Sequence, residues 1–383
     1  MRLSPVLRSQ ATYPFVRLDD AKRRVAERGV TLVDFGMGDP REKTDERIVR
    51  ALVDALPATE GYPRAQGLPE LREAIAAWAR RRFGVELDPE TEVVPTYGSK
   101  EAIFSFAQVL LDPAGGKDVV VVTEPAYPVP ERGAAFAGAE VVRLPLLEEH
   151  EFLPDLDAVP DELWRRAAVV WVNYPNNPTA AVAPLPFYER LAGLAAEHEF
   201  VLASDEAYSE LWFDEPPPSA LQVRETGARV AVFNSLSKRS SMTGYRSAFV
   251  AGDVEVVAAL KAFRPNVGTA PQEFVQRASV VAWGDEGHVE RTRALYARKR
   301  ALLLGLFERA GLRVAGSAAT MYLWVAVPDG GSSEAFAERL LEAGVVVTPG
   351  SYLGPSGEGY VRLALVPTEE ECAVAVERLE GLL

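Results

Sequence analysis

The sequence has few of the residues that disulfide scaffolds and metal sites require. Cys372 is the only cysteine among 383 residues, so no disulfide can form within the chain. It lies in a stretch typical of a C-terminal helix, where we expect a small buried apolar side chain. The three histidines, His150, His198 and His288, are far apart in the sequence. Because metal sites need several ligands close together, we expect none here.

The chain also lacks long apolar runs and an excess of basic residues. No stretch is long and apolar enough to span a bilayer, and the first residues lack the apolar segment of a signal peptide. We therefore expect a cytoplasmic protein with no membrane partner. The 41 basic residues are outnumbered by 55 acidic ones, which gives a formal net charge of −14. Such a chain repels phosphate backbones, which argues against a nucleic-acid partner.

The chain does have the length and apolar content for a large core, with 48% hydrophobic residues. Up to about residue 270, β-branched apolar runs alternate with helical patterns such as 100–111 and 186–199. Strands buried on both faces have this appearance, and their alternation with helices indicates a mainly parallel sheet. The expected strands lie within 118–128, 140–146, 167–179, 200–208, 229–238 and 246–253.

The pattern changes after residue 271. Two helical stretches, the second of them long, are followed by short apolar runs that alternate with helices. We predict an α/β protein whose large domain spans residues 45–270 and has a mainly parallel sheet flanked by helices. A smaller α+β domain is expected from residues 271–383, with residues 1–44 packed against it.

Polar clusters follow four of the predicted strands: "EPAYP", "NYPNNPT", "SDEAY" and "NSLSK". In open α/β sheets, ligands bind beyond the carboxyl ends of the strands. We therefore expect these four clusters to line one cleft.

The stretch "SLSKRSSMTGYRSAF" sets Lys238 among hydroxyls, with Arg246 eight residues further on. A lysine amine can form a Schiff base with a carbonyl group. Ser235, Ser237 and Arg246 can bind a phosphate, which would offset the crowded positive charge. Pyridoxal phosphate is an aldehyde with a phosphate arm and fits both features. The alternative is an ordinary solvated lysine.

Asp205 in "SDEAY" can pair with the pyridinium nitrogen of such a cofactor. Tyr208 and Asn177 can donate hydrogen bonds to the phenolic oxygen of its ring. A plainer role is available for two of them, because Asp205 can cap a helix and Asn177 can belong to a simple turn.

Three further motifs complete the pattern. Tyr127 in "EPAYP" can stack on a planar ring, although an aromatic residue there can also belong to the core. In "TYGSKEAIF", the amides of Ser99 and Lys100 can hold a phosphate at a helix N-terminus. Arg362 lies in the apolar run "YVRLALV" and requires an anion, which is either a structural carboxylate or a substrate carboxylate held by two hydrogen bonds.

Taken in order, these motifs resemble those of the fold type I pyridoxal-phosphate aminotransferases of class I/II. The resemblance extends from "DFGMGDP" to "YVRLALV", and it implies a catalytic role for Lys238, Asp205 and Tyr208. It implies cofactor contacts from Ser99, Lys100, Tyr127, Asn177, Asp205, Tyr208, Ser235, Ser237, Lys238 and Arg246. It implies substrate contacts from Tyr13, Gly38, Asn177 and Arg362.

Tyr62 in "GYPRAQGLPELREAI" matches a family tyrosine that reaches the cofactor phosphate of a neighbouring subunit, which implies a homodimer. Two positions depart from the family pattern. Ala180 stands where glycine is common after "NPT", and Ala248 stands where a glycine is expected after "RS".

The flanking stretches "SKRSSMTGYRSAFVAGD", "AWGDEGHVE" and "TMYLWVAVP" resemble most closely the succinyldiaminopimelate aminotransferases of lysine biosynthesis. That resemblance implies glutamate and 2-oxoglutarate as the donor pair. The alternatives are an aspartate or aromatic aminotransferase, an LL-diaminopimelate aminotransferase, and a pyridoxal-phosphate-dependent carbon–sulfur lyase. A transcription regulator with an aminotransferase-like domain would need a DNA-binding module, for which there is no basic segment. Lys238 and Asp205 argue against a structural protein that has lost catalysis.

Overall fold

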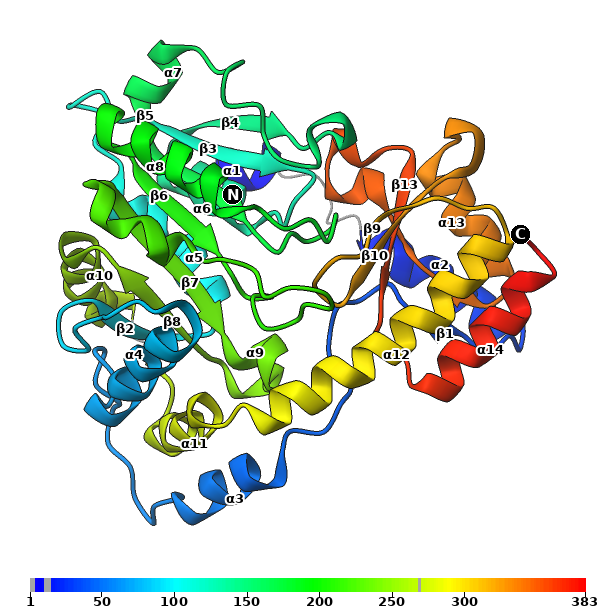
Figure 1. Ribbon diagram of the computed structural model, residues 1–383, viewed down its shortest axis with the longest axis horizontal. Helices are drawn as coiled ribbons and strands as arrows, with labels where there is room; N and C mark the ends of the chain where they lie inside the picture. Colours follow the sequence, from blue (N-terminus) through cyan, green and yellow to red (C-terminus); the bar gives the residue numbers. More distant parts are fainter. Residues whose placement is uncertain (1–3, 10–14, 268–269) are drawn as a thin grey trace.

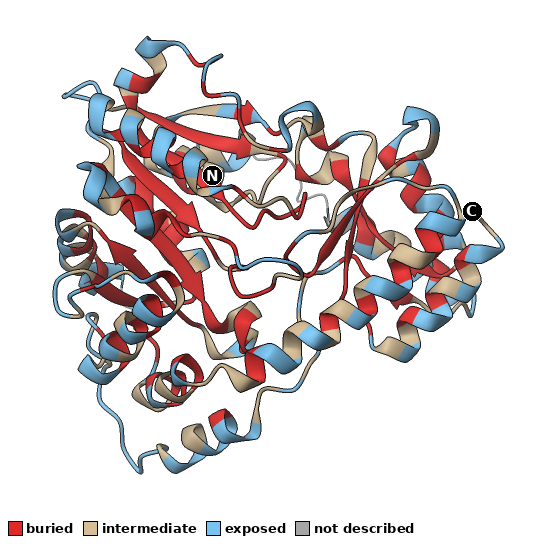
Figure 2. Ribbon diagram, in the orientation of Figure 1, coloured by how far each residue is buried: buried red, intermediate tan, exposed pale blue. Residues whose placement is uncertain are grey.

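The computed structural model describes residues 4–9, 15–267 and 270–383. Two groups of strands and helices lie side by side, joined by the long helix α12 (Gly287–Arg309) along one flank (Figure 1). Buried residues are concentrated in the strands, whereas the outward faces of the helices are exposed (Figure 2). Within the described ranges, no helix combines the length and the apolar content that crossing a bilayer requires.

The larger group is built on a seven-stranded sheet. Strand β8 runs antiparallel to both of its neighbours, and all other adjacent pairs are parallel, so the predicted mainly parallel sheet is confirmed. The strands, in sheet order, are β2 (Val93–Tyr97), β8 (Ser247–Gly252), β7 (Arg229–Ser235), β6 (Val201–Asp205), β5 (Ala167–Asn173), β3 (Val119–Glu124) and β4 (Glu140–Pro145).

Strand β2 is not among the predicted strands, and its sequence explains why. It is short and contains Pro95, which cannot donate a hydrogen bond to a sheet ladder. The sheet tolerates this proline because β2 is an edge strand with β8 as its only neighbour among the described residues.

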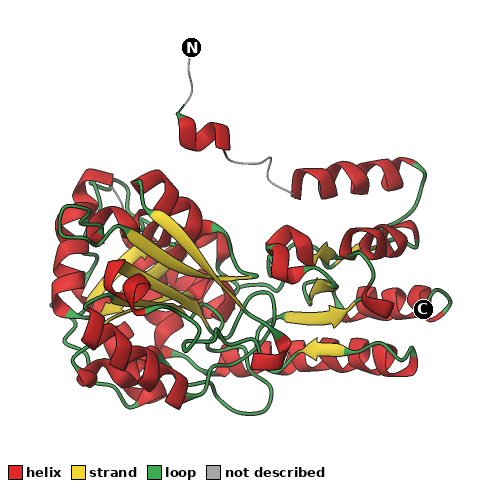
Figure 3. Ribbon diagram, turned by 90° about the horizontal axis from the view of Figure 1, so that it is seen from above, coloured by secondary structure: helices red, strands yellow, loops and turns green. Residues whose placement is uncertain are grey.

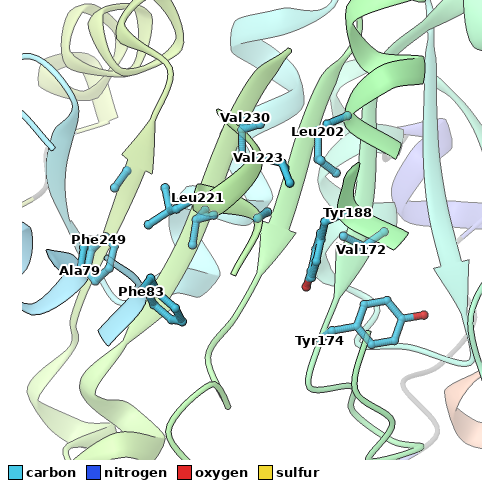
Figure 4. Packing of buried hydrophobic residues seen from close by; sticks show 14 of the residues in the cluster. Ala79, Phe83, Val172, Tyr174, Tyr188, Leu202, Leu221, Val223, Val230 and Phe249 are labelled. Carbon is cyan, nitrogen blue, oxygen red and sulfur yellow. The ribbon is translucent and has the colours of Figure 1, made fainter. Parts of the chain in front are cut away.

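Helices cover both faces of this sheet, and each face has its own hydrophobic cluster. Figure 4 shows part of one cluster, in which Val172 and Leu202 of the sheet lie beside Tyr188 of α8. On the other face, the rings of Phe106, Trp171 and Phe233 meet at centroid distances of 4.8–5.4 Å. The helices are α3 (Glu46–Asp54), α4 (Pro69–Phe83), α5 (Ser99–Leu110), α6 (Val129–Ala137), α7 (Asp161–Arg166), α8 (Leu185–His198), α9 (Leu236–Arg239), α10 (Val254–Val267) and α11 (Glu273–Gly284).

The smaller group has a four-stranded antiparallel sheet in the order β12 (Thr348–Pro349), β13 (Tyr360–Ala364), β10 (Tyr322–Ala326) and β9 (Val314–Gly316). Strand β1 (Val33–Asp34) pairs in parallel with β11 (Val345–Val346). The helices of this group are α2 (Phe15–Glu27), α12, α13 (Ser333–Glu342) and α14 (Glu369–Glu380), and α1 (Pro5–Ser9) stands clear of the sheets (Figure 3). Cys372 is buried in α14, as expected.

Two contacts bear on the predicted domain boundaries. The pairing of β1 with β11 joins the N-terminal segment to the smaller group, against which residues 1–44 were expected to pack. Helix α11 lies beyond residue 270, yet its Ala278, Ala282 and Trp283 belong to the hydrophobic cluster of the large sheet. We therefore propose that the large domain extends through α11 and that the smaller domain resumes at α12.

Candidate active site

The polar ends of several strands meet at one cavity of about 510 Å³. It lies at the carboxyl ends of β5, β6 and β7, and residues of β10 and β13 close its other side. The predicted convergence of the four polar clusters on one cleft is therefore confirmed. The residues singled out from the sequence that line the cavity are Gly38, Ser99, Lys100, Tyr127, Asn177, Asp205, Tyr208, Ser235, Ser237, Lys238, Arg246 and Arg362.

One described residue among those singled out does not line this cavity. Tyr62 lies between α3 and α4 with a fully exposed side chain, at 102% relative accessibility. Tyr13 lies outside the described residues.

Lys238 occupies α9, a four-residue helix directly after β7. Ser235 caps this helix by accepting a hydrogen bond from the Ser237 amide at 3.1 Å. The Lys238 amine donates to the carbonyl of Gly38, which comes from the N-terminal segment. Burial lowers the pKa of Lys238 to about 8, Asp39 acts in the opposite direction, and the nearby Arg362 and Arg246 lower the pKa further. About a tenth of this amine is therefore neutral and nucleophilic at pH 7, far more than for an ordinary lysine.

The residue after Lys238 points away from the cavity. The Arg239 guanidinium is buried over the ring of Trp283, 5.0 Å from its centroid. It donates to the Ala282 carbonyl at 2.6 Å and to Glu286 at 2.8 Å. Arg239 therefore has no contact with the cleft. Its contacts attach α9 to the junction of α11 and α12.

A buried polar chain adds a second attachment for α9. The Ser240 hydroxyl lies 2.7 Å from Nε2 of His288, and Nδ1 of that ring lies 2.7 Å from the Asp285 carboxylate. Because these groups do not line the cavity, we interpret them as structural support.

Asp205 ends β6 with its carboxylate at the cavity. Its backbone carbonyl accepts a hydrogen bond from the Asn173 side chain at 2.7 Å, and its carboxylate accepts one from the Ala207 amide at 3.3 Å. Among the described residues, no basic side chain pairs with this carboxylate within 4.0 Å. Burial raises the pKa of Asp205 to about 6. A cation bound in the cavity would therefore stabilise the charged carboxylate, and a protonated pyridine ring is such a cation.

A second corner of the cavity suits a phosphate. Gly98 precedes α5 at φ +74° and gives that helix no side-chain cap, so an anion can take the place of the cap. A Cβ atom on Gly98 would lie 2.0 Å from Nη2 of Arg246, which shows how closely the guanidinium approaches this turn. The hydroxyls of Ser235 and Ser237 lie 2.9 Å apart. Guanidinium, hydroxyls and a helix N-terminus together form the donor set that a phosphate requires.

Arg362 lies on β13, buried at 4% exposure, on the far side of the cavity. It donates to the Asn177 side chain at 2.8 Å and to the Gly36 carbonyl at 2.7 Å. Within the described part of the chain, it has no carboxylate within 4.0 Å, and its Nε has no hydrogen-bond partner. The structural salt bridge weighed as an alternative is therefore absent among these residues. The charge of Arg362 is available to an anionic ligand.

Among the lining residues missed from the sequence, two act on groups that were singled out. Tyr322, at the start of β10, lies with its hydroxyl 2.9 Å from that of Tyr208. Asp39 lies beside Gly38 and raises the pKa of Lys238. The motif "GMGDP" could have indicated Asp39, because this carboxylate adjoins a glycine already assigned to the cleft. Nothing in "MYLWVAV" marks Tyr322, because a tyrosine in a strand usually serves packing.

The loop after β5 explains why glycine is common at position 180. Ala180 is fully buried and has φ +58°, in the left-handed region that side chains disfavour. The extra methyl group therefore acts on the backbone conformation, and Ala180 does not line the cavity.

Comparisons with known proteins agree with this geometry. The family model described as aminotransferase class I and II matches residues 30–379. The LL-diaminopimelate aminotransferase of Aquifex aeolicus is 42% identical over 375 residues, which are 97% of this chain and 96% of the relative. A mutant of Thermus thermophilus aspartate aminotransferase superposes with a TM-score of 0.92 at 33% identity and covers 100% of both chains. A probable N-succinyldiaminopimelate aminotransferase from Thermus thermophilus has a TM-score of 0.88 and 35% identity, over 96% of this chain and 100% of that one.

Proposed function

The chain belongs to the class I and II aminotransferases, a family that depends on pyridoxal phosphate, and from this premise we propose that it transfers an amino group from LL-diaminopimelate to 2-oxoglutarate. The observation that carries the reaction type is the shared cavity. It presents the Lys238 amine, the Asp205 carboxylate and the Arg362 guanidinium to one ligand.

The choice of substrate rests on the relatives. The LL-diaminopimelate aminotransferase of Aquifex aeolicus matches nearly the whole chain at 42% identity. The succinylated substrate, expected first from flanking stretches, is represented by a solved structure at 35% identity that is described as probable. The comparisons therefore favour LL-diaminopimelate, the alternative reading, over its succinylated derivative.

We propose that the residues of the cavity hold the cofactor in four places. Asp205 keeps the proton on the ring nitrogen, Tyr127 stacks on the ring, and Asn177 and Tyr208 donate to the ring oxygen. When bound, pyridoxal phosphate supplies an aldehyde that bonds to amines and a ring that accepts electrons from the substrate Cα. The phosphate is held by Ser99, Lys100, Ser235, Ser237 and Arg246.

The substrate is positioned from the opposite side. Arg362 binds the α-carboxylate through two parallel hydrogen bonds, beside Gly38 and Asn177. This grip turns the Cα–H bond toward Lys238. The Lys238 Nζ would be placed to take the proton from Cα as general base and to pass it to the bound cofactor, which would keep the amino group once water has released the oxo acid. After release of the first oxo acid, 2-oxoglutarate occupies the same carboxylate site, and Lys238 moves the proton in the reverse direction.

We further propose a homodimer in which Tyr62 binds the cofactor phosphate of the neighbouring subunit. The side chain of Tyr62 is fully exposed in the single chain. Val49, Val53 and Leu56 nearby on and after α3 are also exposed apolar residues. A second copy that covers this region would bury them together with Tyr62.

A donor screen tests the substrate. LL-diaminopimelate, its N-succinyl derivative, aspartate and phenylalanine are each offered with 2-oxoglutarate, and glutamate formation is measured. We expect the highest kcat/KM with LL-diaminopimelate. Its oxo product retains a free amine that can condense with the new ketone, so mass spectrometry should show a product that has lost water. The succinylated product has a blocked amine and cannot form this ring.

The outcomes separate the levels of the proposal. A higher kcat/KM with aspartate or phenylalanine would refute the substrate and leave the aminotransferase intact. Release of a thiol, pyruvate and ammonia from cysteine conjugates, without amino transfer, would indicate the lyase alternative. The Lys238→Ala variant is the control, and it should form no glutamate with any donor.

A further inference from the structure

Tyr322 is a cavity residue to which the proposed reaction assigns no role. It begins β10, where it pairs with Ala364 of β13, and its side chain is buried at 2% exposure. The hydroxyl nevertheless reaches the cavity lining. A buried phenol that only fills space gains nothing from its oxygen, so the partners of that oxygen carry the argument.

The first partner is the hydroxyl of Tyr208, at 2.9 Å. The two rings meet edge to face, with centroids 5.5 Å apart and an interplanar angle of 66°. Each phenol has one proton to donate. If Tyr208 donates its proton to the ring oxygen of the cofactor, it can take part in the shared hydrogen bond only as acceptor. Tyr322 must then be the donor.

The Tyr322 ring also lies against the proposed substrate clamp. The Arg362 guanidinium lies over this ring, with Cζ 4.5 Å from the centroid, which is within the range of a cation–π contact. The Tyr322 hydroxyl also lies close to Gly38. A Cβ atom at position 38 would be only 2.0 Å from this hydroxyl oxygen, so only glycine fits there. The Gly38 carbonyl in turn accepts a hydrogen bond from Lys238. The Tyr322 side chain therefore contacts Tyr208, Arg362 and the glycine whose carbonyl accepts the hydrogen bond from Lys238.

We propose that Tyr322 is a positioning residue of the transamination site, whose hydroxyl directs the Tyr208 proton toward the cofactor and whose ring supports Arg362. This inference rests on the proposed function. The hydroxyl acts through Tyr208: a donor to the Tyr208 oxygen makes the Tyr208 O–H a stronger donor, because linked hydrogen bonds polarise one another. The ring acts on substrate carboxylate binding. The two roles can be separated by substitution.

Tyr322→Phe removes the hydroxyl and keeps the ring under Arg362. Without the Tyr322 hydroxyl, Tyr208 is a weaker donor to the cofactor ring oxygen, and the negative charge on that oxygen is stabilised less. The bound cofactor therefore holds its proton more tightly. We expect the pH midpoint of the visible absorbance change of the bound cofactor to rise by about 0.5–1, the size of one hydrogen bond expressed as a pKa change. The dissociation constant of a non-reactive dicarboxylate such as maleate should stay as in the wild type.

Tyr322→Leu removes the ring as well. It should raise the midpoint in the same way and also weaken maleate binding several-fold, because Arg362 loses the aromatic face beneath it. Tyr360→Phe is the matched control. Tyr360 also lies in the small sheet and donates to Glu148 at 2.6 Å, but it does not line the cavity. It should change neither quantity.

A double-mutant cycle gives the decisive comparison. Tyr208→Phe should raise the midpoint further than Tyr322→Phe, and the double variant should match Tyr208→Phe alone, because the Tyr322 hydroxyl acts only through Tyr208. An unchanged midpoint in both Tyr322 variants, or additive shifts in the cycle, would overturn the inference. If wild-type protein with pyridoxal phosphate shows no pH-dependent visible absorbance, the proposed function itself fails, before any variant is compared.

Discussion

The guanidinium of Arg362 donates to the side-chain oxygen of Asn177 at 2.8 Å, across the gap between the small sheet and the loop after β5. The two residues stand 185 positions apart in the chain. In the proposed reaction, Asn177 contacts both cofactor and substrate, and Arg362 holds the substrate carboxylate. The hydrogen bond therefore holds the cofactor-binding Asn177 and the substrate-binding Arg362 at a fixed distance before any ligand binds.

The pKa of Lys238 predicts selective modification of this amine. Reductive methylation of cofactor-free protein with formaldehyde should reach half its maximal rate at Lys238 near pH 8, because burial and nearby cations destabilise the charged amine. Lys22 is the comparison: burial lowers its pKa, but the ion pair with Asp34 outweighs this and raises the pKa, so this amine should respond at a higher pH than Lys238. Arg362→Met removes one of the cations and should move the Lys238 midpoint upward. Mass spectrometry of the peptides measures both rates, and equal midpoints for the two lysines would contradict the prediction.

Asp205 should promote catalysis but lower the free energy of unfolding of the cofactor-free protein. Its folded-state pKa of about 6 lies above its ordinary value, so the folded state binds a proton on Asp205 more tightly than the unfolded state does. This contribution to stability is lost as the pH rises from about 4 to 6. In cofactor-free protein at pH 8, Asp205→Asn should raise the free energy of unfolding by about 2–3 kcal/mol. The gain should be smaller at pH 5. Urea unfolding at the two pH values measures it.

The same variant should lose at least about 100-fold in kcat, because the charge beside the ring nitrogen is gone. Glu206→Gln is the matched control. Glu206 is also buried, with a pKa raised to about 7, but it lies outside the cavity. It should show a similar gain at pH 8 without the loss of activity. Near-normal transamination by Asp205→Asn would sink the assigned role.

Gly98→Ala should weaken cofactor binding by roughly 10–100-fold, the value of a charge-assisted hydrogen bond. The new Cβ atom would lie 2.0 Å from Nη2 of Arg246 and would displace the guanidinium. Gly84→Ala is the control, because Gly84 has a similar φ of +71° and nothing lies within 4 Å of the place that an alanine Cβ would take. Fluorescence titration with pyridoxal phosphate gives both dissociation constants. Equal losses in the two variants would mean that backbone strain alone is responsible.

Arg362→Lys should slow both half-reactions by roughly 10–100-fold, because a point charge replaces a planar fork. Single-turnover absorbance changes with the amino donor and with 2-oxoglutarate measure the halves separately. Arg378→Lys, a small-domain change at a side chain that bonds only backbone carbonyls among the described residues, should leave both rates unchanged. Impairment confined to one half-reaction would contradict a shared clamp.

Tyr62→Phe should weaken cofactor binding by about 1–2 kcal/mol, as expected for one hydrogen bond to a charged group. If Tyr62 serves the neighbouring subunit, mixed dimers of Tyr62→Phe and Lys238→Ala chains contain one complete site, with Lys238 from one chain and Tyr62 from the other. Each mixed dimer should regain wild-type cofactor affinity in one of its two sites. A fully active monomer, or mixtures without recovery, would rule out the shared site.

The sequence predicted the strand ends of the large sheet well, because buried parallel strands are continuous apolar runs and their polar ends stand out. Asp205 ends such a run, and Lys238 and Asn177 lie within four residues of the end of one. Residues that depend on tertiary pairing were harder to find. Tyr322 meets Tyr208 only because β10 faces the large sheet across the cavity, and no local pattern encodes that contact. Helix α11 packs on the large sheet although it was expected with the smaller domain, since its amphipathic pattern fits either sheet.

The position of β13 near the end of the chain has a consequence for synthesis. Strands β2 to β8, with the lysine, the carboxylate and the phosphate corner, are complete by residue 252, whereas the substrate clamp on β13 follows more than a hundred residues later. Because N-terminal parts can fold while the rest is still being made, a nascent chain can form the cofactor corner before Arg362 has left the ribosome. Cofactor capture can thus precede the ability to grip a substrate.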